Sequence, residues 1–198
     1  MAQNPASAFT KHTHFFDHDS QVTSIFLHQE MQYFATSSTD GTCNLYNLVK
    51  LELLRCFRHP SLNPVATVIL SCQPLVCLAM FSQTDRTWIS HSINGQNLND
   101  LEDPETVLKN CSEESSQIVA PKVIQNAHFL ERLIYGTEKG YIVIRELPFM
   151  APLKRISIST NNLIQPVLTF IVSKDRRFLL VGCGEGGLTV ITEPFSSA

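Results

Sequence analysis

The chain has 198 residues, of which 43% are hydrophobic and 17% are charged, so it is able to bury a sizeable core and is unlike a disordered protein. Its formal net charge of -3 argues against broad nucleic-acid binding, which needs clustered lysine and arginine. No apolar stretch reaches the ~20 residues of a membrane-spanning helix, and the N-terminus lacks the apolar segment of a signal peptide. We therefore expect a cytoplasmic protein, with no direct membrane insertion and with its six cysteines reduced.

The N-terminal part of the chain has the pattern of strands joined by tight turns. Residues 21–28 (QVTSIFLH), 32–38 and 43–48 are rich in β-branched and aromatic residues, which favours strands. Asp40 and Gly41 separate the second of these runs from the third. An Asp-Gly pair between two strands is typical of a hairpin turn, because glycine tolerates the positive φ that such turns need.

The next apolar run, residues 65–81 (VATVILSCQPLVCLAMF), carries Gln73 and Pro74 in its middle and is predicted to form two strands. Cys72 and Cys77 lie in this run. Because no second cysteine pair follows, we interpret them as buried strand cysteines rather than metal ligands. Trp88, the one tryptophan, lies in a further strand pattern and is expected to be either a core residue or an anchor for a partner.

The polar stretch at residues 100–117 (DLEDPETVLKNCSEESSQ) separates the two halves of the chain. It contains several carboxylates, but it has neither the spacing nor the central glycine of a calcium-binding loop. Pro104 interrupts its helical pattern. We expect a solvated loop whose charge favours a basic partner.

The C-terminal part repeats the succession of strand, turn and strand at residues 132–147 and 168–191. Residues 181–191 (VGCGEGGLTVI) hold four glycines and invite comparison with a phosphate-binding loop. Such a loop opens a helix, whereas this one is followed by a β-branched run that ends at proline. We therefore predict a hairpin turn. The turn glycines Gly41, Gly140 and Gly187 are all expected to have positive φ.

Four of these inner turns align at a nearly regular period. Gly41, Arg86, Gly140 and Gly187 stand 45, 54 and 47 residues apart, which is the size of a four-stranded propeller blade. The predicted fold class is therefore all-β, with a flexible N-terminal segment at residues 1–14 and an array at residues 15–198. The predicted blades lie near residues 15–58, 59–119, 120–165 and 166–198.

Residues 17–47 (DHDSQVTSIFLHQEMQYFATSSTDGTCNLYN) resemble a WD repeat. His18 stands at the family's histidine position, Thr36 or Ser38 at its strand hydroxyl, Asp40 at its turn aspartate and Tyr46 at its tryptophan. The resemblance implies a buried hydrogen-bonded network of these residues that locks the blade. The later repeats lack most of this signature. WD rings usually have seven blades, so the four blades are expected to be part of a larger propeller.

Residues 91–105 (HSINGQNLNDLEDPE) and 140–150 (GYIVIRELPFM) are similar to the C-terminal WD repeats of BEACH-domain, neurobeachin-like proteins. This resemblance implies a non-catalytic scaffold that binds other proteins in membrane or vesicle trafficking, peripheral at membranes and without a cofactor. The expected partners include the rest of a larger propeller or a BEACH domain.

The alternative function is a metal-binding enzyme or sensor. His12, His14 and His18, with neighbouring aspartates, have a metal-like composition at the N-terminus.

The last predicted blade, near residues 166–198, contains only three predicted strands. Its third strand ends near residue 192, so a fourth strand would have to come from residues 8–17 or from an upstream segment. The isolated chain is therefore expected to self-associate or to depend on a partner.

Overall fold

The structure, a computed structural model, describes residues 13–99, 117–125, 131–160 and 163–195. Within these ranges the chain forms four antiparallel sheets of three or four strands, one small two-stranded sheet and very little helix, so the all-β fold class is confirmed. The first sheet consists of β1 (Val22–His28), β2 (Tyr33–Ser38), β3 (Thr42–Asn47) and β4 (Glu52–Arg58). The second sheet consists of β5 (Val65–Ser71), β6 (Cys77–Ser82) and β7 (Thr87–Ser92).

The third sheet consists of β8 (Ile118–Gln125), β9 (Glu131–Thr137), β10 (Tyr141–Glu146) and β11 (Pro152–Ser157). The fourth sheet consists of β14 (Val167–Val172), β15 (Phe178–Cys183) and β16 (Leu188–Thr192). A small two-stranded sheet of β12 (Ser159–Thr160) and β13 (Leu163–Ile164) links the third sheet to the fourth. Each strand pairs with its neighbour in sequence, as a series of hairpins requires.

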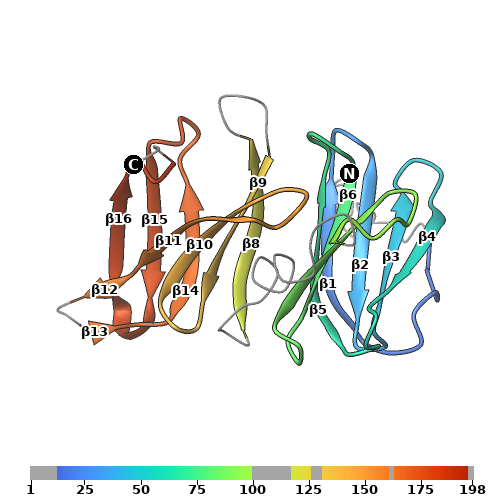
Figure 1. Cartoon of the computed structure of the whole chain (residues 1–198), viewed down its shortest axis with the longest axis horizontal. Helices are drawn as coiled ribbons and strands as arrows, with labels where there is room; N and C mark the ends of the chain where they lie inside the picture. Colours follow the sequence, from blue (N-terminus) through green and yellow to red (C-terminus); the bar gives the residue numbers. More distant parts are fainter. Residues whose placement is uncertain (1–12, 100–116, 126–130, 161–162, 196–198) are drawn as a thin grey trace, which may run out of the picture.

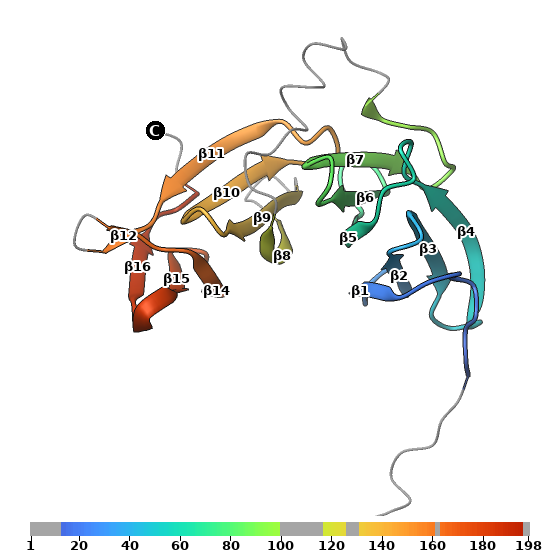
Figure 2. The same cartoon turned by 90° about the horizontal axis from the view of Figure 1, so that it is seen from below.

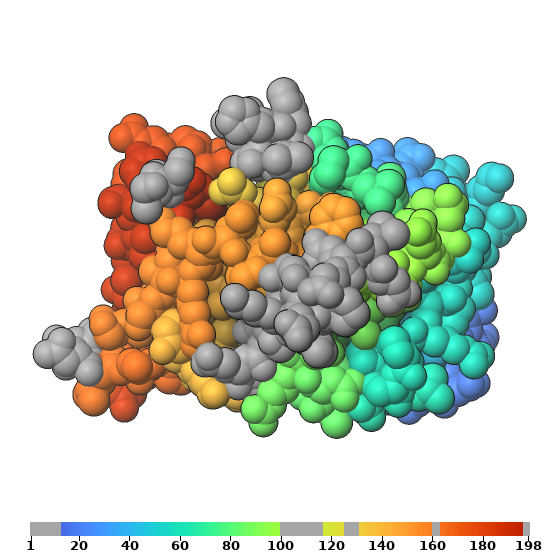
Figure 3. Space-filling view, in the orientation of Figure 1, coloured from blue at the N-terminus to red at the C-terminus, as the bar shows by residue number. Residues whose placement is uncertain are grey.

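The four sheets follow one another side by side across the molecule (Figure 1). The second view shows that they lie on an arc, with β1, β5, β8 and β14 on its concave side (Figure 2). The first and fourth sheets stand at the two ends of this arc and face each other across its open side. In the space-filling view the chain likewise progresses from the first sheet at one edge to the fourth at the other (Figure 3).

Three hydrophobic cores fill the three junctions between successive sheets. Leu78 and Met80 of β6 point into the core shared with the first sheet, whereas Ala79 and Phe81 of the same strand point into the core shared with the third. This division follows from the alternation of side chains along a strand. The third core joins the third and fourth sheets and contains Ile134, Ile142, Ile144, Ile158, Val167, Phe170, Leu179, Val181 and Cys183.

The burial of a strand depends on its place in the arc. All six residues of β6, in the second sheet, are buried, because sheets cover both of its faces. Along β16 in the fourth sheet, where one face has no neighbouring sheet, exposed residues alternate with partly exposed ones and none is buried. The continuous apolar run at residues 75–81 and the alternating run at residues 188–192 thus correspond to inner and end positions.

Trp88 is a core residue rather than an exposed anchor. Its indole is fully buried between the second and third sheets, beside Phe81 and Tyr135. The sequence left both possibilities open, because polar residues flank Trp88 on either side.

The structure departs from the predicted four-stranded pattern in two sheets. Within the described residues, the second and fourth sheets have three strands each, so uniformly four-stranded units are not observed. The predicted loop at residues 100–117 lies almost wholly outside the described ranges, as do residues 1–12 of the predicted N-terminal segment. The strands β4, β8 and β11 were not predicted from the sequence.

The segment expected to complete the fourth sheet lies elsewhere where it is described. Phe15 packs edge-on against Phe34 and Tyr46 of the first sheet, with ring centroids 5.6 and 4.8 Å apart. These contacts place residues 13–17 at the opposite end of the arc. The proposal that they supply a strand to β16 is therefore wrong for this part of the segment.

Candidate functional site

A hydrogen-bonded network joins the segment before β1 to the turn after β2. His18 Nε2 lies 2.7 Å from the hydroxyl of Thr36, and His18 Nδ1 lies 3.0 Å from the hydroxyl of Thr42 and 3.3 Å from Asp40 Oδ2. The hydroxyl and backbone N–H of Thr42 both donate to Asp40 Oδ1, and the backbone N–H of Asp19 donates to Asp40 Oδ2. The network thus ties the incoming chain to a strand and to a turn.

The electrostatics of Asp40 favour its ionised form. Burial raises the pKa of this carboxyl, but the hydrogen bonds from Thr42 and Asp19, together with the charge of His18, lower it by more. The net pKa of Asp40 is therefore below its usual value. A carboxylate that accepts several hydrogen bonds in this way is held in one orientation.

Ser38 and Tyr46 take different places around this network. The Ser38 hydroxyl accepts a hydrogen bond from the backbone N–H of Asp40, whereas Thr36 supplies the hydroxyl of β2 that lies against His18. The ring of Tyr46 is buried and stacks on Phe34, with centroids 4.6 Å apart. Burial raises the pKa of Tyr46, and hydrogen bonding with Asn44 and Thr36 opposes this effect.

The second sheet contains a related network that the sequence reading had not identified. His59 Nδ1 lies 2.8 Å from the hydroxyl of Ser61, which donates to Asp85 Oδ2 at 2.6 Å. The side-chain amide of Asn63 donates to the other carboxylate oxygen of Asp85. His59 precedes β5 and Asp85 lies in the turn after β6, the positions that His18 and Asp40 occupy in the first sheet. The shared signal is a Thr-Asp-x-Thr turn with a histidine upstream.

The third and fourth sheets tie the corresponding turns differently. In the third, the hydroxyl of Thr137 accepts the backbone N–H of Tyr141 across the turn. In the fourth, the side-chain amide of Gln165 donates to the carboxylate of Glu185 at 3.1 Å, at an exposed site. Neither of these turns is held by a histidine within the described residues.

The turn glycines agree with the prediction at two of three positions. Gly41 has a φ of +82° and Gly140 a φ of +74°, whereas Gly187 has a φ of -69°, so its predicted positive φ is wrong. In the last turn the left-handed positions are Glu185 and Gly186, the two residues before Gly187. Adjacent glycines each permit this conformation, so the sequence did not specify which of them adopts it.

The glycine-rich segment joins two adjacent antiparallel strands, β15 and β16. Only a single 3-10 turn, Gly184–Gly186, lies between them. A phosphate-binding loop requires the N-terminus of a following helix. The segment is therefore a hairpin connection, as the β-branched run after it had indicated.

The N-terminal histidines are not brought together as a metal site. Both ring nitrogens of His18 are hydrogen-bonded within the first sheet, and the ring of His14 stacks on Phe16. His12 lies outside the described residues. Among the residues that the structure describes, the metal-ligating side chains that do converge are His28, Cys72 and Glu131. Cys72 lies just beyond β5 and is only half-buried, so it is not a buried strand cysteine.

Both ends of the arc expose apolar faces. In the fourth sheet, Leu180 pairs with Ile171 on one side and Val190 on the other, so the three side chains share one face. Ile171, Val190 and nearby Leu188 are exposed. On the first sheet, Ile25 and Leu27 of β1 are also exposed. A cavity of about 470 Å³ is lined by Ile25 together with Phe16, Phe34 and Tyr46, among others.

Comparison with known proteins supports part of the sequence resemblance. No protein-family model matches the chain. The chain is 24% identical over 173 residues to BEACH domain-containing protein B of Arabidopsis thaliana. This alignment covers 87% of the chain but only 6% of that much longer protein.

Two solved structures of computationally designed proteins, Ika4 and Ika8, have a similar fold, each with a TM-score of 0.59. Their sequence identities of 17% and 18% restrict the likeness to the fold. The alignments cover 90% of this chain and 95% of Ika4, but 88% of this chain and 46% of Ika8. Such a run of sheets therefore occurs both as nearly an entire chain and as part of a longer one.

The described residues contain no helix long and apolar enough to span a membrane.

Proposed function

We propose that the chain is a non-catalytic scaffold made of WD-type blades of a β-propeller. The observation that carries this proposal is the recurrence of a network of histidine, hydroxyl and aspartate at matching places in the first two sheets. In both sheets the network ties the segment before the inner strand to the turn between the next two strands. A repeated tie of this kind holds a blade rigid, and its exposed loops and edges are then free to bind partners.

The polar groups of these networks have a structural use. His18 and Asp40 bond to strand and turn residues, and Ser61 joins His59 to Asp85. These contacts stabilise blades and leave the loops for recognition. They are the reason for preferring a scaffold to an enzyme.

The exposed apolar faces at the two ends of the arc support a role within a larger ring. In a propeller each sheet covers the face of the next, so an end sheet without a neighbour leaves its apolar face in water. We therefore propose that further blades, a BEACH domain or a second copy of the chain cover these faces. The partial coverage of Ika8 is consistent with four sheets serving as part of a longer array.

The similarity to BEACH domain-containing protein B supports an assignment to proteins of that type. By analogy, the chain acts in membrane or vesicle trafficking, in the cytoplasm and peripheral at membranes, through contacts with other proteins. No nucleic acid or cofactor is part of this function.

Sedimentation of the purified chain tests the ring proposal. We expect self-association at tens of micromolar, and we expect Leu188→Lys combined with Val190→Lys to shift the chain toward monomer, because the charges disrupt an apolar contact. Leu75→Lys is the control, because Leu75 is exposed in a turn of the second sheet rather than on an end face. A compact wild-type monomer that melts cooperatively would show that four sheets suffice alone.

Proximity labelling in cells tests the trafficking role. A tagged wild-type chain is expected to label proteins of vesicle or organelle membranes, and the Leu188→Lys, Val190→Lys variant to label fewer of them. Labelling of the same cytosolic proteins by wild type, variant and an unrelated tagged protein would contradict the role.

A further inference from the structure

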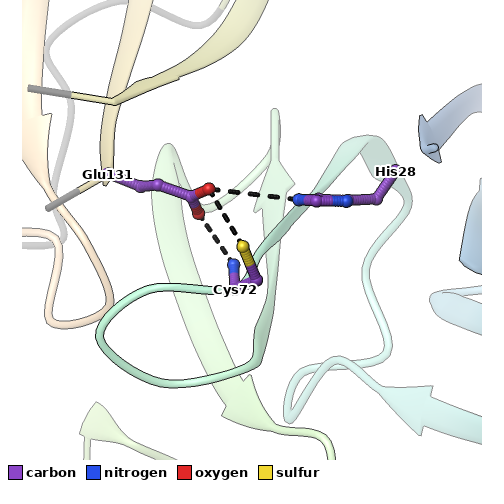
Figure 4. A group of neighbouring side chains, drawn as sticks. All are labelled: His28, Cys72 and Glu131. Atoms are coloured by element: carbon purple, nitrogen blue, oxygen red, sulfur yellow. Dashed lines mark hydrogen bonds and ion pairs between the residues drawn. The ribbon is translucent and has the colours of Figure 1, made fainter. Parts of the chain in front are cut away.

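Three side chains from three different sheets lie close to one another (Figure 4). His28 is the last residue of β1, Cys72 directly follows β5, and Glu131 is the first residue of β9. Their ligand atoms all lie within 4.8 Å of one another. Positions 28, 72 and 131 are far apart in sequence, so only the packing of the first three sheets brings them together.

Hydrogen bonds fix the orientation of the Glu131 carboxylate. Its Oε2 accepts the hydroxyl of Ser71 at 2.6 Å and the backbone N–H groups of Cys72 and Gln73 at 2.7 and 3.4 Å. Its Oε1 has no backbone donor among the described contacts: it accepts the thiol of Cys72 at 3.2 Å and lies 4.0 Å from His28 Nε2. Oε2 is thus held by hydrogen bonds from residues 71–73, and Oε1 faces the thiol of Cys72 and the imidazole of His28.

These donor types and separations suit a zinc-type ion. Zinc binds thiolate sulfur at about 2.3 Å and imidazole nitrogen or carboxylate oxygen at about 2.0–2.2 Å, so tetrahedral ligand atoms stand roughly 3.4–3.6 Å apart. The observed separations of 3.2 Å from sulfur to oxygen and 4.0 Å from nitrogen to oxygen bracket this range. Calcium and magnesium prefer sites built from oxygen alone.

An open cavity of about 320 Å³ lies beside the cluster and is lined by His28 and Glu131, among others. It provides a path for an ion and room for a water molecule as a further ligand. A site with three protein ligands and one open position is a common arrangement for zinc.

A cysteine nucleophile fits this arrangement less well. The thiol of Cys72 donates to the Glu131 carboxylate rather than to His28. Burial and this carboxylate raise the pKa of Cys72 to about 11, so the free thiol stays protonated. A divalent ion would supply the positive charge that the thiolate lacks.

We propose that His28, Cys72 and Glu131 bind a zinc-type divalent ion through Nε2, Sγ and Oε1. The thiol proton passes to solvent on binding. The long 3.4 Å hydrogen bond from the backbone N–H of Met31 to His28 Nδ1 is given up, because the ring proton then resides on Nδ1. The ion joins the first three sheets at one point.

The test is metal binding by the full chain after treatment with a chelator. We expect stoichiometric uptake of zinc and a higher melting temperature with zinc than without it. Cobalt(II) is expected to give a thiolate charge-transfer band in the near ultraviolet. Cys72→Ser is expected to abolish that band, and both Cys72→Ser and His28→Gln are expected to weaken zinc binding at least tenfold.

Matched controls keep the outcome interpretable. Cys56→Ser removes an exposed cysteine, and His14→Gln removes an exposed histidine; neither should alter metal binding. Circular dichroism establishes that each variant is folded, and Glu131→Gln is avoided because it disturbs the Ser71 and Cys72 hydrogen bonds. Failure to bind zinc stoichiometrically, unchanged binding by a folded Cys72→Ser variant, or loss of binding with His14→Gln instead would overturn the proposal.

Discussion

The first two sheets and the last two sheets build their inner turns from similar strand pairs but fix these turns differently. In the first half, His18 and His59 each connect the incoming segment to a turn aspartate, directly or through a serine hydroxyl. In the second half, among the residues that the structure describes, the inner turn of the fourth sheet is tied by an exposed contact from Gln165 to Glu185. In the third sheet the buried guanidinium of Arg145 donates hydrogen bonds to the hydroxyl of Tyr135 and to the carbonyl of Met150.

This difference separates two contributions to the fold. Strand pairing and apolar packing are present in all four sheets, so these are enough to shape a sheet. Within the described residues, histidine networks occur in two of these sheets, where they tie the sheet to the segment that enters it. Substitutions of turn glycines should therefore reduce the stability of both halves by similar amounts, whereas substitutions of polar turn residues should reduce it by different amounts.

The largest effect is expected from Gly41→Ala and Gly140→Ala, one in each half. Both glycines have positive φ, which costs other residues about 1–2 kcal/mol. An added Cβ would also lie 2.7 Å from the carbonyl oxygen of Leu62, or 2.6 Å from that of Gln165, so overpacking adds about 1–3 kcal/mol. Chemical denaturation should show similar losses for both variants.

Two other glycines of the last turn serve as controls for the Gly41 and Gly140 variants. Gly186→Ala should show only the conformational cost, because Gly186 has positive φ but no atom within 4 Å of an added Cβ. Gly187→Ala should be close to neutral, since Gly187 has an ordinary negative φ. Equal losses at Gly41 and Gly187 would contradict the assigned turn geometry.

The next largest effect is expected from the turn carboxylates, where the halves should differ. Asp40→Ala leaves His18 and Thr42 without their shared partner and should cost about 1–3 kcal/mol, or several degrees in melting temperature. Asp85→Ala should cost less, because 30% of the Asp85 side chain is exposed, against 11% for Asp40. Glu185→Ala should stay within about 0.5 kcal/mol.

Asp19→Ala is the control for this second series. The Asp19 side chain is exposed, and only its backbone contacts Asp40. An Asp40→Ala variant that melts at the wild-type temperature would mean that the network contributes nothing to stability.

A smaller effect is expected from pH, through His59. Burial lowers the pKa of His59 below its usual value near 6.5, against the opposing charge of Asp85. As pH falls below 6.5, the unfolded chain therefore takes up a proton before the folded chain does, and stability decreases. Denaturation between pH 7 and pH 5 should show this loss, and His59→Gln should reduce it. An equal slope in both proteins would assign the pH dependence to other groups.

Most of the strands, though not the inner strand β8, were predictable because their signals are local. Apolar runs and turn residues mark β1 to β3, β5 to β7, β9, β10 and β14 to β16 within a few residues each. The outer strands β4 and β11 were not recognised, because most of their residues are exposed and show no apolar period. Their order comes from pairing with the neighbouring strand rather than from their own sequence.

The polar sites were predictable only where the spacing matched a known repeat. His18, Thr36 and Asp40 stand at such a spacing, whereas His59 works through Ser61, and two extra residues separate it from its strand. The cluster of His28, Cys72 and Glu131 has no local signal at all. Its members meet through the packing of three sheets, which no short window of sequence encodes.

The division of β6 between two cores has a consequence for how the chain comes apart. A sheet in the middle of the arc cannot detach without opening two interfaces at once, whereas the fourth sheet has only one interface to lose. The free energy of local unfolding should therefore be lowest for the end sheets and should increase toward the middle of the arc, as in a linear array in which each unit contacts only its neighbours. Amide hydrogens of β15 should therefore exchange sooner than those of β6, although both are central strands of three-stranded sheets. The order of exchange would measure the coupling between neighbours directly.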